Sequence, residues 1–321
     1  MMKQAFLCII YRVVAYVLQP LFLLSGPTRR IPGGYFMIML CLSVFFPTSK
    51  LYGSCIETRI DSILQGRNMT VGIYAKCGEF CYQRNAREKF PLMSVFKVHV
   101  AMAVLERLVH EGVSVDSMVH VDKSSMHENT YSPLRDRNKG CDFDISVADL
   151  IRSSVSESDN NACDLLIDMV GGIRKVDRYV RRCLGVGGQK LMRTEYDMHR
   201  DVSDCRDNWT TPYAMVRVLE KVFDGAPPVF GLLREAMFGT VTGCDKIRAG
   251  ISPEIDVAHK TGSSDRVEGI KIGDNDAAVV VLPTGEICYM VVFIKDSAES
   301  DAVNASVTAA MAREIMRAVT K

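Results

Sequence analysis

The placement of the strand-like segments constrains the fold most, because they lie at both ends of the chain and bracket a long helical block. Near the start, residues 70–75 and 79–82 read as two short strands around a glycine turn. Near the end, similar runs cover residues 257–260, 277–282 and 287–295, the last two joined by a Pro-Thr-Gly turn. We therefore expect one antiparallel sheet built from two distant parts of the chain.

The middle of the chain changes to helical spacing. From Pro91 to about Asp224, apolar residues recur with a helical period, and glycines stand where helices would end. The expected helices cover residues 92–109, 147–155, 161–170 and 212–223, with a closing helix at about 302–319. The pattern predicts a two-lobed α/β fold, an antiparallel sheet flanked by N- and C-terminal helices plus an inserted all-α lobe. The α/β lobe would comprise residues 55–90 and 238–321, and the α lobe residues 91–237. Ligands of two-lobed proteins tend to bind in the crevice between the lobes.

The first 54 residues are typical of an export leader. They carry five basic side chains and no acidic one, and Arg29 and Arg30 precede a short apolar run at residues 35–46. The run is short for a membrane span. We expect cleavage near residues 53–55 and a periplasmic protein, with lipid attachment at Cys55 as an alternative. An earlier apolar stretch, residues 5–24, leaves the true start methionine open.

Charge favours a small-molecule ligand. Without the five basic residues of the leader, the remainder has four more acidic than basic side chains and no basic stripe with interleaved aromatics. This argues against nucleic acid as a partner. Contact with a membrane is expected only through the leader or a lipid anchor.

The chain has eleven cysteines. Cys77 and Cys81 flank the predicted hairpin turn, so a local disulfide is an option in an exported protein. We expect Cys163, Cys183 and Cys244 to be small buried side chains. No cysteine or histidine spacing predicts zinc, so no metal is expected.

The first motif that carries chemistry is Ser94-Val95-Phe96-Lys97, at the start of the apolar helix after Pro91. Positions three apart share a helix face, so the amine of Lys97 can approach the hydroxyl of Ser94. The helix N-terminus adds N–H groups and positive potential for a developing oxyanion. By itself the motif is weak, since a chain of this length contains about one such match by chance.

Two later motifs are equally weak in isolation. Ser158-Asp159-Asn160, between two helical segments, could relay a proton and hold a substrate carbonyl, but it also suits a plain helix N-cap. Lys260-Thr261-Gly262 ends a predicted strand, where it could bind an anion beside the strand edge or simply form a turn.

The order of the three motifs resembles that of class A β-lactamases and penicillin-binding proteins. The resemblance extends from about residue 57 to 318 and includes Tyr131, where the family has an aromatic residue at the mouth of the site. The segment from Arg193 to Pro212 resembles the Ω-loop of class A β-lactamases, in which Glu195 matches the glutamate that orients the hydrolytic water. By this resemblance the chain is a serine β-lactamase.

Several positions depart from the common family pattern. His199 stands where the family usually has the asparagine that shares the hydrolytic water, and Asp164 stands where it has another asparagine. Asn208 replaces the aspartate that usually pairs with Arg193. This combination is similar to a divergent branch that includes extended-spectrum, cephalosporin-hydrolysing enzymes. Arg193 would then need another partner, such as Asp207. The arginine that often binds the substrate carboxylate has no clear match, and Lys246 is the best candidate.

The resemblance implies a mechanism without metal or organic cofactor. Ser94 attacks the lactam carbonyl after losing its proton to Lys97 or, through water, to Glu195, and both bases stay open. Backbone N–H groups of Ser94 and Ser263 would hold the oxyanion. The other expected roles are proton delivery by Ser158, substrate contacts from Asn160, carboxylate binding by Lys260, Thr261 and Ser263, and deacylation by water on Glu195.

Two rival functions share the first three motifs. A penicillin-binding peptidase or transpeptidase would lack Glu195 in an Ω-loop, and a β-lactam sensor would acylate without turnover. Met93 and Ser264 exclude a disulfide that some carbapenem-hydrolysing relatives carry at those two positions, which favours cephalosporins. We expect a monomer.

Overall fold

The computed structural model describes residues 49–183 and 185–320. Most of the predicted leader, residues 1–54, lies outside the described residues, as do the side chains of residues 49–55, including Cys55. Among the helices that the structure describes, none is both long and apolar enough to cross a membrane.

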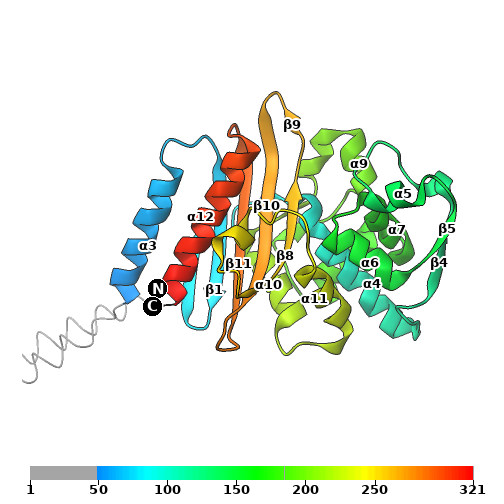
Figure 1. The fold of residues 1–321 in the computed structure, drawn as a ribbon, viewed down its shortest axis with the longest axis horizontal. Coiled ribbons are helices and arrows are strands. Elements are labelled where there is room, and N and C mark those ends of the chain that lie inside the picture. Colours follow the sequence, from blue (N-terminus) through cyan, green and yellow to red (C-terminus); the bar gives the residue numbers. More distant parts are fainter. Residues whose placement is uncertain (1–48, 184, 321) are drawn as a thin grey trace, which may run out of the picture. The chain divides into compact units, whose positions relative to one another are not determined.

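One antiparallel sheet joins the two ends of the chain, as the sequence predicted (Figure 1). Its strand order is β2-β1-β11-β10-β8, with β9 paired to β10. The strands are β1 (Thr70–Cys77), β2 (Phe80–Arg84), β8 (Asp256–Ser263), β9 (Arg266–Val267), β10 (Ile270–Val281) and β11 (Ile287–Ser297). Strand β8 therefore ends the sheet on the side of the helical block.

Strand β10 begins seven residues before the predicted start at Ala277. The extra residues include Asp274, Asn275 and Asp276, all of which are buried and hydrogen-bonded. Polar side chains interrupt the apolar pattern of a strand, so hydropathy alone places the start of this strand too late.

Both faces of the sheet are covered by helices. Helices α3 (Ser49–Leu64) and α12 (Asp301–Val319) pack on one face, where Ile60, Ile73 and Met311 belong to one apolar core. On the other face, α10 (Pro212–Phe223) and α11 (Gly231–Phe238) join a larger core that extends through the helical block. The resulting arrangement is the expected two-lobed α/β architecture.

The helical block is centred on α4 (Lys97–Glu111), most of which is buried. Gly112 ends α4 with a φ of 67°, a left-handed conformation that glycine adopts without steric cost. The remaining helices are α5 (Pro133–Asn138), α6 (Val147–Ser156), α7 (Asn160–Val170), α8 (Ile173–Arg178) and α9 (Glu195–Arg200). Short strand pairs are formed by β4 (Met118–Val121) with β5 (Phe143–Ser146), and by β7 (Trp209–Thr210) with β3 (Phe90–Pro91) and β6 (Gln189–Lys190). From Gly53 on, the described residues form one compact unit, and the predicted lobe boundaries stay a prediction.

The disulfide differs from the local pairing considered above. Cys77 is bonded to Cys288, and Cys81 is a free, exposed thiol. Cys77 and Cys288 stand opposite each other in the β1–β11 register, with Cα atoms 4.3 Å apart. Cys81 pairs with Lys76 instead, one position from Cys77, and successive side chains of a strand point to opposite faces. A Cys77–Cys81 bond would therefore have to pass through the sheet.

The expectations for the other cysteines had mixed outcomes. Cys163 is buried, as predicted. The prediction for Cys244 was wrong, because it lies exposed in the loop before Lys246. The side chain of Cys183 is outside the described residues.

Replacement of Cys288 by serine is expected to lower the free energy of unfolding by about 2–5 kcal/mol, because the disulfide constrains a long loop of the unfolded chain. Urea unfolding would measure the loss, with Cys81→Ser as the matched control that leaves stability near the wild-type value. Peptide mapping of the oxidised protein should link Cys77 to Cys288. A linked peptide containing Cys81 would contradict the assignment.

Candidate active site

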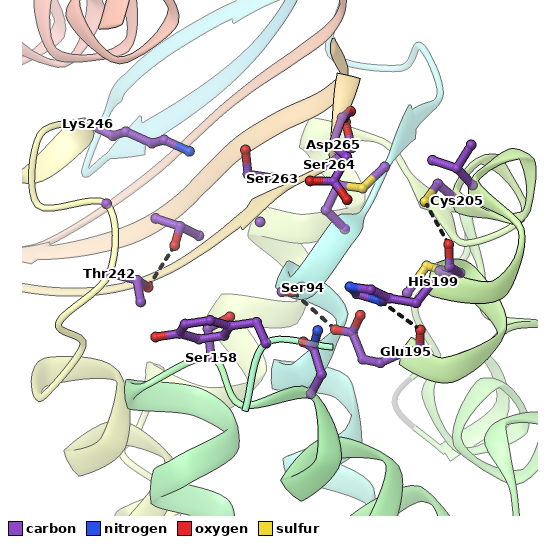
Figure 2. A pocket seen from close by; sticks show the side chains of 18 residues that line it. Ser94, Ser158, Glu195, His199, Cys205, Thr242, Lys246, Ser263, Ser264 and Asp265 are labelled. Atoms are coloured by element: carbon purple, nitrogen blue, oxygen red, sulfur yellow. Dashed lines mark hydrogen bonds between the residues drawn. The ribbon is translucent and has the colours of Figure 1, made fainter. Parts of the chain in front are cut away.

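A cavity of about 430 Å³ lies where β8 meets the helical block. Its lining comes from the start of α4, the segment around residues 158–160, the α9 region and the end of β8 (Figure 2). All three predicted motifs and the predicted Ω-loop therefore meet in one pocket.

Ser94 lies in a 3-10 turn (Met93–Phe96) that leads directly into α4. Met93, before it, has a φ of 47°, a left-handed conformation that non-glycine residues rarely adopt. The Ser94 hydroxyl donates to Glu195 Oε1 at 3.1 Å (Figure 2). The proton of the predicted nucleophile thus already faces a carboxylate.

Lys97 is fully buried, one turn after Ser94. Its ammonium lies 2.6 Å from Asn160 Oδ1, 2.7 Å from the Ser158 carbonyl oxygen and 3.0 Å from Glu195 Oε1. An ammonium has three N–H donors, so three acceptors satisfy it. Lys97 and the Ser94 hydroxyl consequently share one oxygen of Glu195. This geometry leaves both Lys97 and Glu195 as candidates for the base that takes the Ser94 proton.

The segment Ser158-Asp159-Asn160 acts both as a helix cap and as part of the site. Asp159 is the buried N-cap of α7 and also accepts from the backbone N–H of Leu134 at 2.7 Å, which ties two loops together. Ser158 has a φ of 62° and its hydroxyl accepts from Lys260 Nζ at 2.8 Å. The capping interpretation of this motif and the functional one are therefore compatible.

Lys260 and Gly262 lie on the edge strand β8. Lys260 is fully buried, and burial, followed by the nearby charge of Lys97, holds the pKa of Lys260 well below its usual value. At Gly262, an added Cβ would lie 2.7 Å from the backbone nitrogen of Ser94 and 2.9 Å from that of Val95. Only glycine permits this approach, which brings β8 against the N–H groups at the start of the helix.

Glu195 is the first residue of α9, where Thr194 and Asp197 form a capping box. Asp164, from α7, accepts from the backbone N–H groups of Glu195 and Tyr196, each at 2.8 Å. Asp164 thereby attaches the Glu195 segment to the helical block. Its burial, followed by the charge of Glu195, raises the pKa of Asp164 to about 7.

The remainder of the Ω-loop is held by two further residues. Arg193 pairs with Asp207 at 2.8 Å, the partner suggested by the sequence, and also with Asp204 at 3.0 Å. Asn208 accepts from the backbone N–H of Arg193 at 2.9 Å and donates to its carbonyl at 2.8 Å. The amide of Asn208 thus supports the backbone of the loop, while the aspartates hold the Arg193 side chain.

Of the other predicted residues, Tyr131, His199, Thr261 and Ser263 line the cavity. Tyr131 is 55% exposed, which suits a position at the mouth of the pocket. His199 Nδ1 lies 3.1 Å from the Glu195 carbonyl oxygen. Lys246 also lines the cavity, but its ammonium is paired with Asp274 rather than free.

Sequence reasoning missed several lining residues. Thr242 shares a hydrogen bond of 2.9 Å with Thr261, and no motif marks it in the sequence. Met198, Val202 and Cys205 form an apolar side of the cavity. Burial raises the pKa of the Cys205 thiol to about 12, so this thiol is neutral. The helical spacing of Met198 and Val202 was the only signal for this wall.

A possible metal-ligand group lies elsewhere in the part of the chain that is described. Ligand atoms of His120, Asp122 and Asp142 lie within 4.8 Å of one another, and all three residues are exposed. None of them lines the cavity, so they have no part in its chemistry.

Comparison with known proteins agrees with this geometry. The model of a family described as the β-lactamase enzyme family matches residues 55–319. The chain is 40% identical over 296 residues to a β-lactamase of Bacteroides uniformis, which covers 89% of this chain and 99% of the relative. The chain belongs to the β-lactamase family.

Two further relatives support this assignment, and the second identifies it as class A. The extended-spectrum β-lactamase PER-1 of Pseudomonas aeruginosa is 32% identical over 86% of this chain and 91% of its own length. A crystal structure of a class A β-lactamase representative from Bacteroides cellulosilyticus is 41% identical and superposes with a TM-score of 0.78, covering 84% of this β-lactamase and 98% of that chain.

The Asp164→Asn variant of this β-lactamase is expected to show a flatter pH dependence of stability. The pKa of Asp164 rises from an ordinary 3.8 to about 7 on folding, so between these values the native state holds a proton that the unfolded state has lost. The free energy of unfolding should therefore fall as pH rises through this window, by at most about 4 kcal/mol.

Urea unfolding of both proteins at pH 4.5 and 8 measures this slope. Asp168→Asn, which replaces an exposed aspartate one turn later on α7, is the matched control and should keep the wild-type slope. An Asp164→Asn slope equal to that of the wild type would contradict the assigned pKa.

Proposed function

We propose that this β-lactamase hydrolyses its substrates through an acyl-enzyme on Ser94 that is released by a water molecule activated by Glu195. The observation that carries the proposal is the 3.1 Å contact between Ser94 Oγ and Glu195 Oε1, beside the ammonium of Lys97. A general base must lie within hydrogen-bonding reach of the proton that it removes. A carboxylate in contact with the nucleophile is also close enough to direct water at the ester formed there.

Acylation begins when Ser94 Oγ bonds to the lactam carbonyl carbon and its proton passes to Lys97, which accepts it as a neutral amine, or, through water, to Glu195. Lys97 and Glu195 are both compatible with the contacts as this base, because Ser94 and Lys97 each contact Glu195 Oε1. As the tetrahedral intermediate collapses, the carbonyl–nitrogen bond breaks. The ring nitrogen then takes a proton from Ser158, which regains one from the Lys260 Nζ group that donates to its hydroxyl.

The backbone N–H groups of Ser94 and Ser263 would stabilise the oxyanion. The close approach of Gly262 to the Ser94 nitrogen supports this arrangement, since β8 lies directly against the start of the helix. Lys260, Thr261 and Ser263 would bind the substrate carboxylate, and Asn160 would contact a substrate carbonyl. Tyr131 would border the entrance, and His199 would lie beside the water.

The contact with Glu195 also favours hydrolysis over the rival functions. A penicillin-binding peptidase or a β-lactam sensor keeps its acyl adduct because no group activates water against it. Here Asp164 and the capping box of α9 hold Glu195 at the nucleophile. We therefore favour turnover over stoichiometric trapping.

The proposal extends to substrate preference and location. We propose a preference for cephalosporins, supported by the absence of a cysteine pair at Met93 and Ser264 and by the similarity to an extended-spectrum enzyme. We also propose that the basic, apolar leader exports a monomeric enzyme to the periplasm, with Cys55 as a position for a lipid anchor.

Turnover by the purified protein tests the function directly. A chromogenic cephalosporin in large excess should be consumed many times over per enzyme molecule, as counted by absorbance. Ser94→Ala is the control and should consume none. One turnover or fewer per wild-type molecule would instead indicate a trapping protein and contradict hydrolysis.

Replacement of Glu195 by glutamine tests the deacylation step. Acylation should remain largely intact, while the steady-state rate falls by roughly two to four orders of magnitude, the usual contribution of a general base. Mass spectrometry should then detect an accumulated adduct with the mass of the whole substrate. Wild-type steady-state rates in this variant would show that another group activates the water.

A further inference from the structure

A buried ion pair lies behind the end of the pocket where the substrate carboxylate is proposed to bind. The ammonium of Lys246 contacts Asp274 Oδ1, and the two side chains are only 10% and 3% exposed. Lys246 lines the cavity, whereas Asp274 lies on β10 behind it. Figure 2 shows Lys246 and Ser263 together at one end of the pocket, away from His199 and Cys205.

Asp274 makes two further contacts. Its Oδ1 accepts from the hydroxyl of Ser263 at 3.1 Å, and its Oδ2 accepts from Asn304 Nδ2 on α12 at 3.1 Å. The side-chain oxygen of Asn304 in turn accepts from the Ser297 hydroxyl at 2.8 Å. Three donors therefore hold the Asp274 carboxylate in one orientation.

Backbone pairing fixes the distance of this carboxylate from the pocket. Asp274 stands opposite Ser263 in the β10–β8 register. The residue after Lys246, Ile247, donates its backbone N–H to Asp276 Oδ2 at 3.0 Å, so the Lys246 segment is also attached to β10. Neither member of the pair can move away from the pocket without breaking contacts in the sheet.

The electrostatic consequence is that two opposite charges act on any anion beside Ser263. Lys246 attracts the anion and Asp274 repels it, and both are too poorly hydrated for water to screen them fully. A free lysine at this position would make the pocket strongly anion-binding. The pair with Asp274 cancels most of that attraction, and Asp274 also competes with the anion for the hydroxyl proton of Ser263.

We propose that Asp274 is a positioning residue that sets the selectivity of the pocket for anionic substrates, by neutralising Lys246 and orienting Ser263. This inference rests on the proposed binding of the substrate carboxylate beside Ser263. In this inference Lys246 forms a neutral pair with Asp274 and does not contact the substrate directly.

The test compares a chromogenic cephalosporin with the methyl ester of its ring carboxylate. For each protein, the ratio of kcat/KM for the acid to kcat/KM for the ester reports selectivity for the anion and cancels general losses of activity. Asp274→Asn should raise this ratio by about three- to tenfold, and Lys246→Met should lower it by a similar factor. The double variant should return to within about twofold of the wild type, because both charges are then removed.

The alternative, in which Lys246 binds the carboxylate directly and Asp274 only supports it, gives different results. Asp274→Asn would then lower the ratio or leave it unchanged, and the double variant would resemble Lys246→Met. Either result would overturn the inference. The Asp274→Asn ratio should also fall more steeply with added salt than the wild-type ratio, which a merely structural effect would not produce.

Glu314→Gln is the matched control, because it removes one carboxylate charge on α12 that pairs with Arg59 and Arg317. Its ratio should equal that of the wild type. Thermal melting of each variant shows whether it is folded, and the double variant keeps the test decisive if one single variant is unstable. A wild-type protein without turnover of either compound would contradict the proposed function, whereas turnover with equal ratios in all variants would contradict this inference alone.

Discussion

The buried ammonium of Lys97 is the interaction on which the site depends. Its three acceptors come from two distant segments of the chain, which supply the Ser158 backbone and the Asn160 side chain on the one hand and the Glu195 carboxylate on the other. A buried charge without partners is very unfavourable, so these segments must meet wherever α4 carries this lysine. The same ammonium holds Glu195 against the Ser94 hydroxyl. The contacts that satisfy the buried charge of Lys97 therefore also place a carboxylate beside the predicted nucleophile.

Strand β8 completes the site from the opposite side. Lys260 brings a second buried lysine near Lys97, and burial, followed by the nearby charge of Lys97, lowers its pKa. Gly262 allows the strand to approach the backbone of Ser94 more closely than any side chain would permit. The pocket therefore combines two lysines and Glu195 with N–H groups at a helix start, an arrangement suited to charge that develops on an oxygen.

The sequence predicted much of this organisation for identifiable reasons. Apolar residues at helical spacing located α6, α7 and α10 closely, because these helices bury their apolar side chains in the core. The predicted start of α4, at residue 92, falls in the turn that precedes this largely buried helix. The apolar pattern placed the start of β10 too late, because buried polar residues in that strand are satisfied by partners far away in the chain. The disulfide could not be deduced from spacing either, since Cys288 lies opposite Cys77 only through the pairing of β1 with β11.

By itself, the sequence predicted the candidate site residues and their order, because a helix start, an N-cap and a strand edge each favour particular residues. It also indicated the anchoring of Arg193 by Asp207, which is close in the chain. Only the tertiary structure decided what each charge faces. Lys246 looked like a free cation, and the register of β10 against β8 places Asp274 beside it. Such pairings depend on strand register and helix packing between residues that are far apart in the sequence, so local sequence patterns do not predict them.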